Sequence, residues 1–163
     1  MNSGAKIRPI VYGAIINVRF DDLDPYGNVN SGRYMDYVMS SRWSFAAEKF
    51  NMTAADITEN GIGFFLTKSE MNFKKSIIGA GAIFVSSHVQ SIEGAILNVP
   101  FKISSKDGDI LYCNGGLRFA VMDLKTGIPA QLPEFAYKYF FESLTGGDLE
   151  IDPLLGPTHI AQI

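Results

Sequence analysis

The chain has 163 residues, of which 47% are hydrophobic and only 19% charged, a composition that excludes long disordered stretches and suits one domain. Its net charge of −3 gives no electrostatic reason to bind nucleic acid or an anionic membrane. The single cysteine excludes an internal disulfide framework. We find no apolar run of the roughly 20 residues that span a bilayer and no secretory signal, so we expect a cytoplasmic protein.

The first expected element is a strand over residues 10–20. Its apolar side chains Ile16, Val18 and Phe20 alternate with polar ones, which is the pattern of a half-buried strand. A loop with three aspartates follows, and then one helix over residues 31–50, capped by Asn30 or Ser31.

Apolar side chains cover almost the whole circumference of this helix, and such a helix is normally buried on most sides. These side chains are Met35, Val38, Met39, Trp43, Phe45, Ala46 and Phe50.

Four further strands are expected, separated by short glycine-containing turns. They cover residues 64–73, 82–92, 96–105 and 110–122. Pro100 cannot donate to a ladder, so it predicts an edge position or a bulge. Gly115 and Gly116 predict a sharp bend or a close backbone approach. A short helix over Glu134–Leu144 and an irregular tail over residues 145–163 complete the chain.

This order predicts an α+β fold in which one curved antiparallel sheet of about five strands wraps around one long central helix. The turns between the later strands are too short for the crossovers of a parallel sheet. We treat residues 1–163 as a single domain with its core at about residues 10–140.

The loop sequence VRFDDLDPYGNVNSGRY allows several interpretations of its aspartates. Asp21 and Asp22 suit a solvated loop, where acidic residues favour the positive end of the following helix. A calcium loop of the EF-hand type starting at Asp22 fails at two positions. Position five needs an aspartate or asparagine but is Tyr26, and position twelve needs a bidentate glutamate but is Arg33. A dehydratase usually needs a positioned histidine, but His88 suits a polar sheet surface and His159 lies in the tail.

Asp24 allows a further interpretation, the hydrolysis of a thioester. It lies seven residues before Ser31, and the first N–H groups of a helix lack internal partners, so they can donate to a carbonyl oxygen and to the oxyanion formed from it. A nearby carboxylate can attack that carbonyl or deprotonate a water. The thiol leaving group has a pKa of roughly 8.5 and departs without a general acid, whereas an amide would need one.

The stretch RFDDLDPYGNVNSGRYMDYVMSSR resembles the signature of the hotdog-fold thioesterases of the 4-hydroxybenzoyl-CoA thioesterase type. The matching positions are Phe20, Asp22, Asp24, Gly27, Val29, Asn30, Tyr34 and Arg42. The stretch AVMDLKTGIPAQLPEF also resembles the family's last strand and the turn that follows. The resemblance spans about residues 10–140 and implies a hotdog fold.

The resemblance implies that Asp24 is the catalytic nucleophile or general base and that the N–H of Ser31, or of a neighbour, donates to the thioester carbonyl. It places Tyr26, Gly27, Asn28, Asn30 and Tyr34 around the substrate. Lys74, Lys75 and Lys102 are candidates for contacts with coenzyme A phosphates. The implied substrate is a thioester of coenzyme A or of an acyl-carrier protein, no metal or further cofactor is implied, and the implied assembly is a homodimer or homotetramer with the site at the subunit interface.

Two positions depart from the family pattern. Asn28 stands where many relatives carry histidine, although some members without it remain active, and Met39 stands where many carry glutamate. Both changes favour an alternative, a non-catalytic hotdog module that binds acyl-CoA or serves as a scaffold. Among the other residues, Cys113 suits a buried thiol and Trp43 suits the core or an interface. Arg42 suits a hydrogen bond that anchors the helix.

Overall fold

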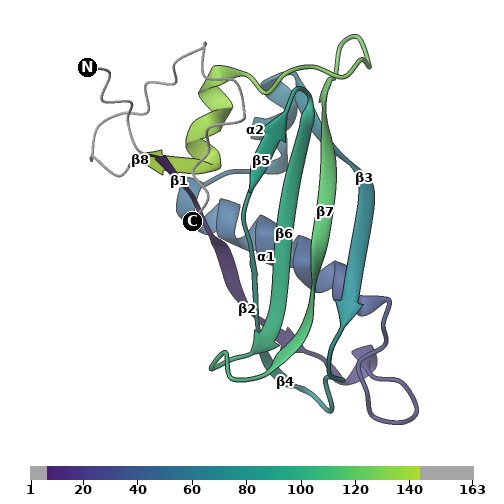
Figure 1. Cartoon of the computed structure of the whole chain (residues 1–163). Helices are drawn as coiled ribbons and strands as arrows, with labels where there is room; N and C mark the ends of the chain where they lie inside the picture. Colours follow the sequence, from purple (N-terminus) through teal and green to yellow (C-terminus); the bar gives the residue numbers. More distant parts are fainter. Residues whose placement is uncertain (1–6, 144–163) are drawn as a thin grey trace.

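The computed structural model describes residues 7–143 and shows one long helix lying against one face of an antiparallel sheet (Figure 1). The helix α1 covers Arg33–Phe50. The sheet contains β2 (Tyr12–Val18), β4 (Gly81–Ser87), β6 (Ile96–Ser105), β7 (Leu111–Asp123) and β3 (Ile62–Phe73), in that order, with β5 (Ser91–Glu93) paired to β6. The expected α+β fold with one long helix is confirmed.

The helix α1 is buried on one side only. Tyr34, Tyr37 and Val38 are buried in the core, whereas Trp43 keeps 47% of its surface exposed. Polar residues such as Asp36 and Ser40 occupy the outward face. The expectation that α1 is buried on most sides is therefore wrong for the single chain, because its apolar side chains include several that the sheet does not reach.

The expected strand over residues 82–92 is divided into β4 and β5, so the sheet has six strands instead of about five. Pro100 lies in β6, between β7 and the two shorter strands, so the edge position is wrong. The break at residues 88–90 lies opposite Pro100, where His88 N–H donates to the Pro100 carbonyl oxygen at 3.4 Å. An interrupted partner strand thus accommodates the missing N–H of this proline.

At Gly115, the backbone of β3 leaves no room for a side chain on β7. A Cβ atom there would lie 1.9 Å from the carbonyl oxygen of Glu70, whereas a Cβ on Gly116 would meet nothing within 4 Å. The close backbone approach is confirmed, and Gly115 alone accounts for it.

Several short elements were not expected from the sequence. They are α2 (Ala54–Glu59), the 3₁₀ helix η1 (Phe20–Asp22), and a two-stranded sheet of β1 (Ile7–Pro9) and β8 (Phe141–Ser143). The region expected to form a helix from Glu134 forms the 3₁₀ helix η2 (Glu134–Tyr139) followed by β8. Leu144, the tail over residues 145–163 and His159 lie outside the described residues. Within residues 7–143, no helix is long and apolar enough to span a membrane.

Candidate active site

The aspartate loop between β2 and α1 folds back on itself as a small hairpin. Leu23 bridges to Val29, and the Asp24 N–H donates to the Asn28 carbonyl oxygen at 2.7 Å. Gly27 closes the turn with a φ of +80°, which costs a side-chain-bearing residue about 1–2 kcal/mol. The sequence Pro-Tyr-Gly thus folds the chain sharply and places Asp24 near the tip.

The Asp24 carboxylate is held by the main chain of its own loop. Its Oδ1 accepts hydrogen bonds from the N–H groups of Tyr26 at 2.8 Å and Asn28 at 3.0 Å. Among residues 7–143, no donor contacts Oδ2. One oxygen therefore fixes the orientation of the carboxylate, and the other remains available to a substrate or a water.

Asp22 is a buried carboxylate, so the expectation that it lies in a solvated loop is wrong. Its Oδ2 accepts hydrogen bonds from the Arg19 N–H at 3.0 Å and the Tyr37 hydroxyl at 2.8 Å, and Arg33 Nε lies 3.4 Å from Oδ1. The Arg19 N–H is the main group that holds the pKa of Asp22 below its usual range, and Tyr37 and Arg33 add to it. By contrast, Asp21 is exposed as expected and pairs with the Arg19 side chain.

The start of α1 presents an open N–H group at Ser31. Gly32 N–H donates to the Asn30 side-chain oxygen at 2.9 Å, and Arg33 N–H donates to the Asn30 carbonyl oxygen at 2.9 Å. For the Ser31 N–H, the described part of the chain provides no acceptor. The helix begins at Arg33, two residues later than expected, and the exposed Ser31 lies in the turn before it. The expected cap by Asn30 or Ser31 is wrong, because Gly32 is the N-cap residue and no side chain of the described residues caps the helix.

A second loop, between β3 and β4, supports the aspartate hairpin. Val29 N–H donates to the Ile77 carbonyl oxygen at 2.9 Å, and Gly79 N–H donates to the Gly27 carbonyl oxygen at 2.9 Å. The Tyr34 hydroxyl accepts the Ile77 N–H at 3.5 Å. Tyr34 is only 3% exposed, so it lies in the core and supports the second loop from the interior of the protein.

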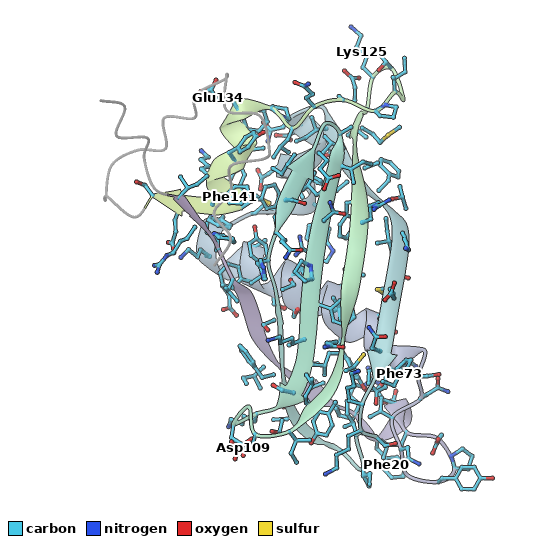
Figure 2. The ribbon with its side chains drawn as sticks, viewed as in Figure 1. Phe20, Phe73, Asp109, Lys125, Glu134 and Phe141 are labelled. Carbon is cyan, nitrogen blue, oxygen red and sulfur yellow. The ribbon has the colours of Figure 1, made fainter. Side chains whose placement is uncertain are left out.

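Exposed apolar side chains surround the hairpin. Phe20 is 86% exposed, Tyr26 88% and Ile78 75%. Figure 2 shows Phe20 and Phe73 at the same end of the molecule. Such a concentration of exposed apolar surface is typical of a binding site or a subunit interface.

The remaining candidate residues lie on the surface or in the core. Lys74 and Lys75 follow β3, with both N–H groups bonded to the Tyr112 carbonyl oxygen and both side chains exposed. Lys102 is exposed on β6. Met39 is partly buried against the core, and Cys113 is fully buried, as expected.

Sequence reasoning missed the structural roles of Asp22 and Tyr37 and the contact of the hairpin with residues 77–79. Asp22 and Tyr37 are 15 residues apart in the sequence, and the hairpin and residues 77–79 are about 50 residues apart. No local sequence pattern predicts contacts over such separations. The only local signal is Tyr37, which lies on the side of α1 that faces the core and is therefore available to a buried partner.

Comparison with known proteins agrees with this architecture. The family model described as the Thioesterase-like superfamily matches residues 18–140. The chain belongs to the thioesterase-like superfamily. It is 22% identical over 111 residues to the long-chain acyl-CoA thioesterase FadM of Escherichia coli strain K12, a match that covers 68% of this chain and 83% of FadM.

Two solved structures share the fold. The probable thioesterase YbaW from Escherichia coli superimposes with a TM-score of 0.68 at 23% identity, covering 78% of this chain and 96% of YbaW. The DHNA-CoA thioesterase from Staphylococcus aureus superimposes with a TM-score of 0.67 at 21% identity, covering 79% of this chain and 85% of that one. The expected hotdog fold is confirmed.

Proposed function

We propose that this thioesterase-superfamily protein hydrolyses acyl-CoA thioesters, with Asp24 as nucleophile or general base and the Ser31 N–H as donor to the carbonyl oxygen. The observation that carries the proposal is the Asp24 carboxylate, which the N–H groups of Tyr26 and Asn28 hold through one oxygen only. The similarity to an acyl-CoA thioesterase over 111 residues supports the substrate class.

In the proposed reaction, the thioester carbonyl accepts the Ser31 N–H, which stabilises the oxyanion of the tetrahedral intermediate. Asp24 Oδ2 either removes a proton from an attacking water or attacks the carbonyl carbon itself and forms an anhydride that water then cleaves. The carbon–sulfur bond breaks, the thiolate leaves, and the acyl group is released as a carboxylic acid. This chemistry requires no metal or redox cofactor.

The departure at Asn28 is compatible with this mechanism. Asn28 contacts Asp24 through its main-chain N–H, which any residue except proline provides. A histidine side chain is therefore not needed to hold Asp24. Asn30 acts through its carbonyl and side-chain oxygens at the start of α1, and Gly27 through its positive φ. Met39 lies partly buried against the core, so a side-chain contact there is apolar.

We propose that Lys74 and Lys75 attract the phosphates of coenzyme A. Both side chains are exposed, and the two residues come just before residues 77–79, which contact the hairpin. Phosphates bind lysine as a point charge, and this attraction weakens with salt. Lys102 is a third candidate.

We further propose a homodimer that forms along β3. This 12-residue strand pairs with β7 on one side only, and Phe65 and Phe73 are each 54% exposed on it. A long apolar edge strand is a template for pairing with another chain. Light scattering coupled to size exclusion tests this, because a monomer at micromolar concentration would contradict it.

The proposed hydrolysis is tested by thiol release from short, long and aromatic acyl-CoAs. We expect Asp24→Asn to lose activity by about two orders of magnitude or more, and Asp21→Asn, the same change at an exposed position of the same loop, to match the native protein. Equal rates for native protein and Asp24→Asn would remove Asp24 from the mechanism. Measurable binding without thiol release from any substrate would favour the binding module.

A further inference from the structure

A cavity lies along the C-terminal half of α1, apart from the aspartate hairpin. Its volume is about 340 Å³, which falls in the range of small-molecule sites, roughly 300–1,000 Å³. No residue of the hairpin lines it. Residues of η2 line it, and Figure 2 shows Glu134, the first residue of η2, at the end of the molecule opposite Phe20.

The walls of the cavity are mostly apolar. They include Met39 and Phe50 of α1, Phe64 of β3, Leu97 of β6 and Phe140 after η2. Trp43 and Phe135 also line the cavity and are 47% and 43% exposed, so they lie at its rim. The cavity is thus open to solvent at an aromatic mouth.

Arg42 places a cation in this apolar space. Its guanidinium carbon lies 5.1 Å from the centre of the Tyr12 ring and 5.6 Å from that of the Phe119 ring. Its Nη1 donates to Ser87 Oγ at 2.9 Å, which confirms the expected anchoring bond between α1 and the sheet. Burial lowers the pKa of Arg42.

Arg42 has no counter-charge within residues 7–143, since it forms none of the ion pairs found there. The cavity does contain one carboxylate, Asp56, but its Oδ2 accepts the N–H and hydroxyl of Thr53 at 2.6 and 2.7 Å. The Tyr12 hydroxyl donates away from Arg42, to the Tyr139 carbonyl oxygen. A cation in apolar surroundings without a carboxylate partner is costly.

Arg42 lines the cavity, and its unused N–H groups are not fully buried. Among the described residues, every fully buried side-chain nitrogen or oxygen has a hydrogen-bond partner. The Arg42 donors other than Nη1 are therefore not sealed within the protein, and Arg42 lines the cavity. Guanidinium presents a planar fork that matches a carboxylate with two parallel hydrogen bonds.

We propose that this cavity binds an apolar carboxylic acid, with its carboxylate on Arg42 and its hydrocarbon part among the aromatic and aliphatic walls. The site is separate from the proposed hydrolysis because the hairpin contributes nothing to it. The acid could be the product of that hydrolysis or could come from another reaction, because both acids have the carboxylate and the hydrocarbon part that the cavity would bind. Either source would place a ligand against the C-terminal half of α1.

Trp43, the only tryptophan of the chain, reports occupancy of the cavity by its fluorescence. We expect decanoate at neutral pH to change the emission of the native protein saturably. Decanamide, which has the same chain but no charge, is expected to bind at least about tenfold more weakly, since hydrogen bonds to charged groups are the stronger ones. Equal affinities, or no saturable change with decanoate, would overturn the proposal.

Two variants locate the decanoate. Arg42→Gln is expected to weaken decanoate binding at least about tenfold and leave decanamide binding unchanged. Asp24→Asn is expected to bind decanoate like the native protein, whatever its hydrolytic activity. Loss of decanoate binding in Asp24→Asn would place the acid at the hairpin and overturn the proposal. If Arg42→Gln fails to fold, the comparison of decanoate with decanamide on the native protein still decides.

The source of the acid is tested with the native protein and Asp24→Asn in parallel. After incubation with decanoyl-CoA, a Trp43 response in the native protein alone indicates that the released product fills the cavity. The same response to added decanoate in both proteins indicates that the cavity also accepts acid made elsewhere. A response to decanoyl-CoA without any response to decanoate would assign the cavity to the thioester and overturn the proposal.

Discussion

The Tyr37 hydroxyl donates a 2.8 Å hydrogen bond to Asp22 Oδ2, and this bond ties the aspartate loop to the second turn of α1. Asp22 also accepts the Asn30 N–H at 2.9 Å through its main-chain oxygen, so it holds both ends of the hairpin. The position of Asp24, two residues later, therefore depends on the buried carboxylate and the main-chain oxygen of Asp22.

The first prediction concerns Asp22 and pH. The folded-state pKa of Asp22 is below its ordinary value of 3.8, so its stabilisation is fully present above that value. It is lost as the pH falls through the lower folded-state pKa. We expect Asp22→Asn to lower the free energy of unfolding at pH 7 by about 1.5–3 kcal/mol and to flatten its decline below pH about 4. Urea unfolding across pH measures both effects.

Asp21→Asn is the control for this experiment. Asp21 is exposed, so its contribution to stability is expected to lie within about 0.5 kcal/mol. If the free energy of unfolding of Asp22→Asn declines below pH about 4 as steeply as that of the native protein, other carboxylates dominate acid unfolding.

The second prediction concerns the Ser31 N–H. Ser31→Pro removes the donor at a position where the described structure uses it for no internal hydrogen bond, and proline is tolerated at the start of a helix. Ser31→Ala keeps the donor and removes only the hydroxyl. We expect the proline variant to lose about 10²–10³ in kcat, the usual cost of one oxyanion donor, and the alanine variant to keep near-native kcat.

Circular dichroism and unfolding midpoints establish that both Ser31 variants are folded. A large loss in Ser31→Ala would assign the effect to the hydroxyl. Native kcat in Ser31→Pro would remove this N–H from the reaction.

The third prediction concerns Asn30, which matches the family motif and also bonds the Gly32 N–H through its side-chain oxygen. Asn30→Ala is expected to lower the free energy of unfolding by about 1 kcal/mol, the typical net contribution of one hydrogen bond, whereas Asn30→Asp keeps a side-chain acceptor and is expected to retain the native stability. Denaturant midpoints measure the difference. Equal unfolding midpoints for Asn30→Ala and the native protein would show that the Asn30 side chain does not stabilise the fold. Contact with the substrate would then be its remaining role.

The long elements could be predicted from the sequence because period-2 and helical apolar patterns extend over seven or more residues in them. The Asp24 loop could be found because its Pro-Tyr-Gly turn and the following helix start are local features. The helix α2 had a local signal as well, since Thr53 and Asp56 form a capping box.

The rest depends on contacts between distant parts of the chain. Ile7 of β1 pairs with Ser143 of β8, and strands of three residues carry no usable periodicity. The burial of Asp22 requires Tyr37, and the environment of Arg42 requires the rings of Tyr12 and Phe119 from two strands. A sequence pattern places each residue on an element but does not place those elements against each other.

The fourth prediction concerns the two adjacent glycines of β7. A Cβ on Gly115 would lie 1.9 Å from the Glu70 carbonyl oxygen and 2.9 Å from the Phe101 ring, so Gly115→Ala forces β3 away from β7. We expect a loss of on the order of 3 kcal/mol in the free energy of unfolding, the upper end for overpacking. Gly116→Ala meets nothing within 4 Å and is expected to change stability by less than about 1 kcal/mol.

Urea unfolding of both glycine variants is measured at one protein concentration, because subunit association makes the apparent stability depend on concentration. Because β3 is the proposed dimer edge, Gly115→Ala is also expected to weaken the dimer in light scattering, and Gly116→Ala to leave it intact. Equal destabilisation by the two variants would show that loss of glycine itself, and not the contact with Glu70, governs this part of the sheet. Destabilisation by Gly115→Ala with an unchanged dimer would indicate that the subunits associate through a surface other than β3.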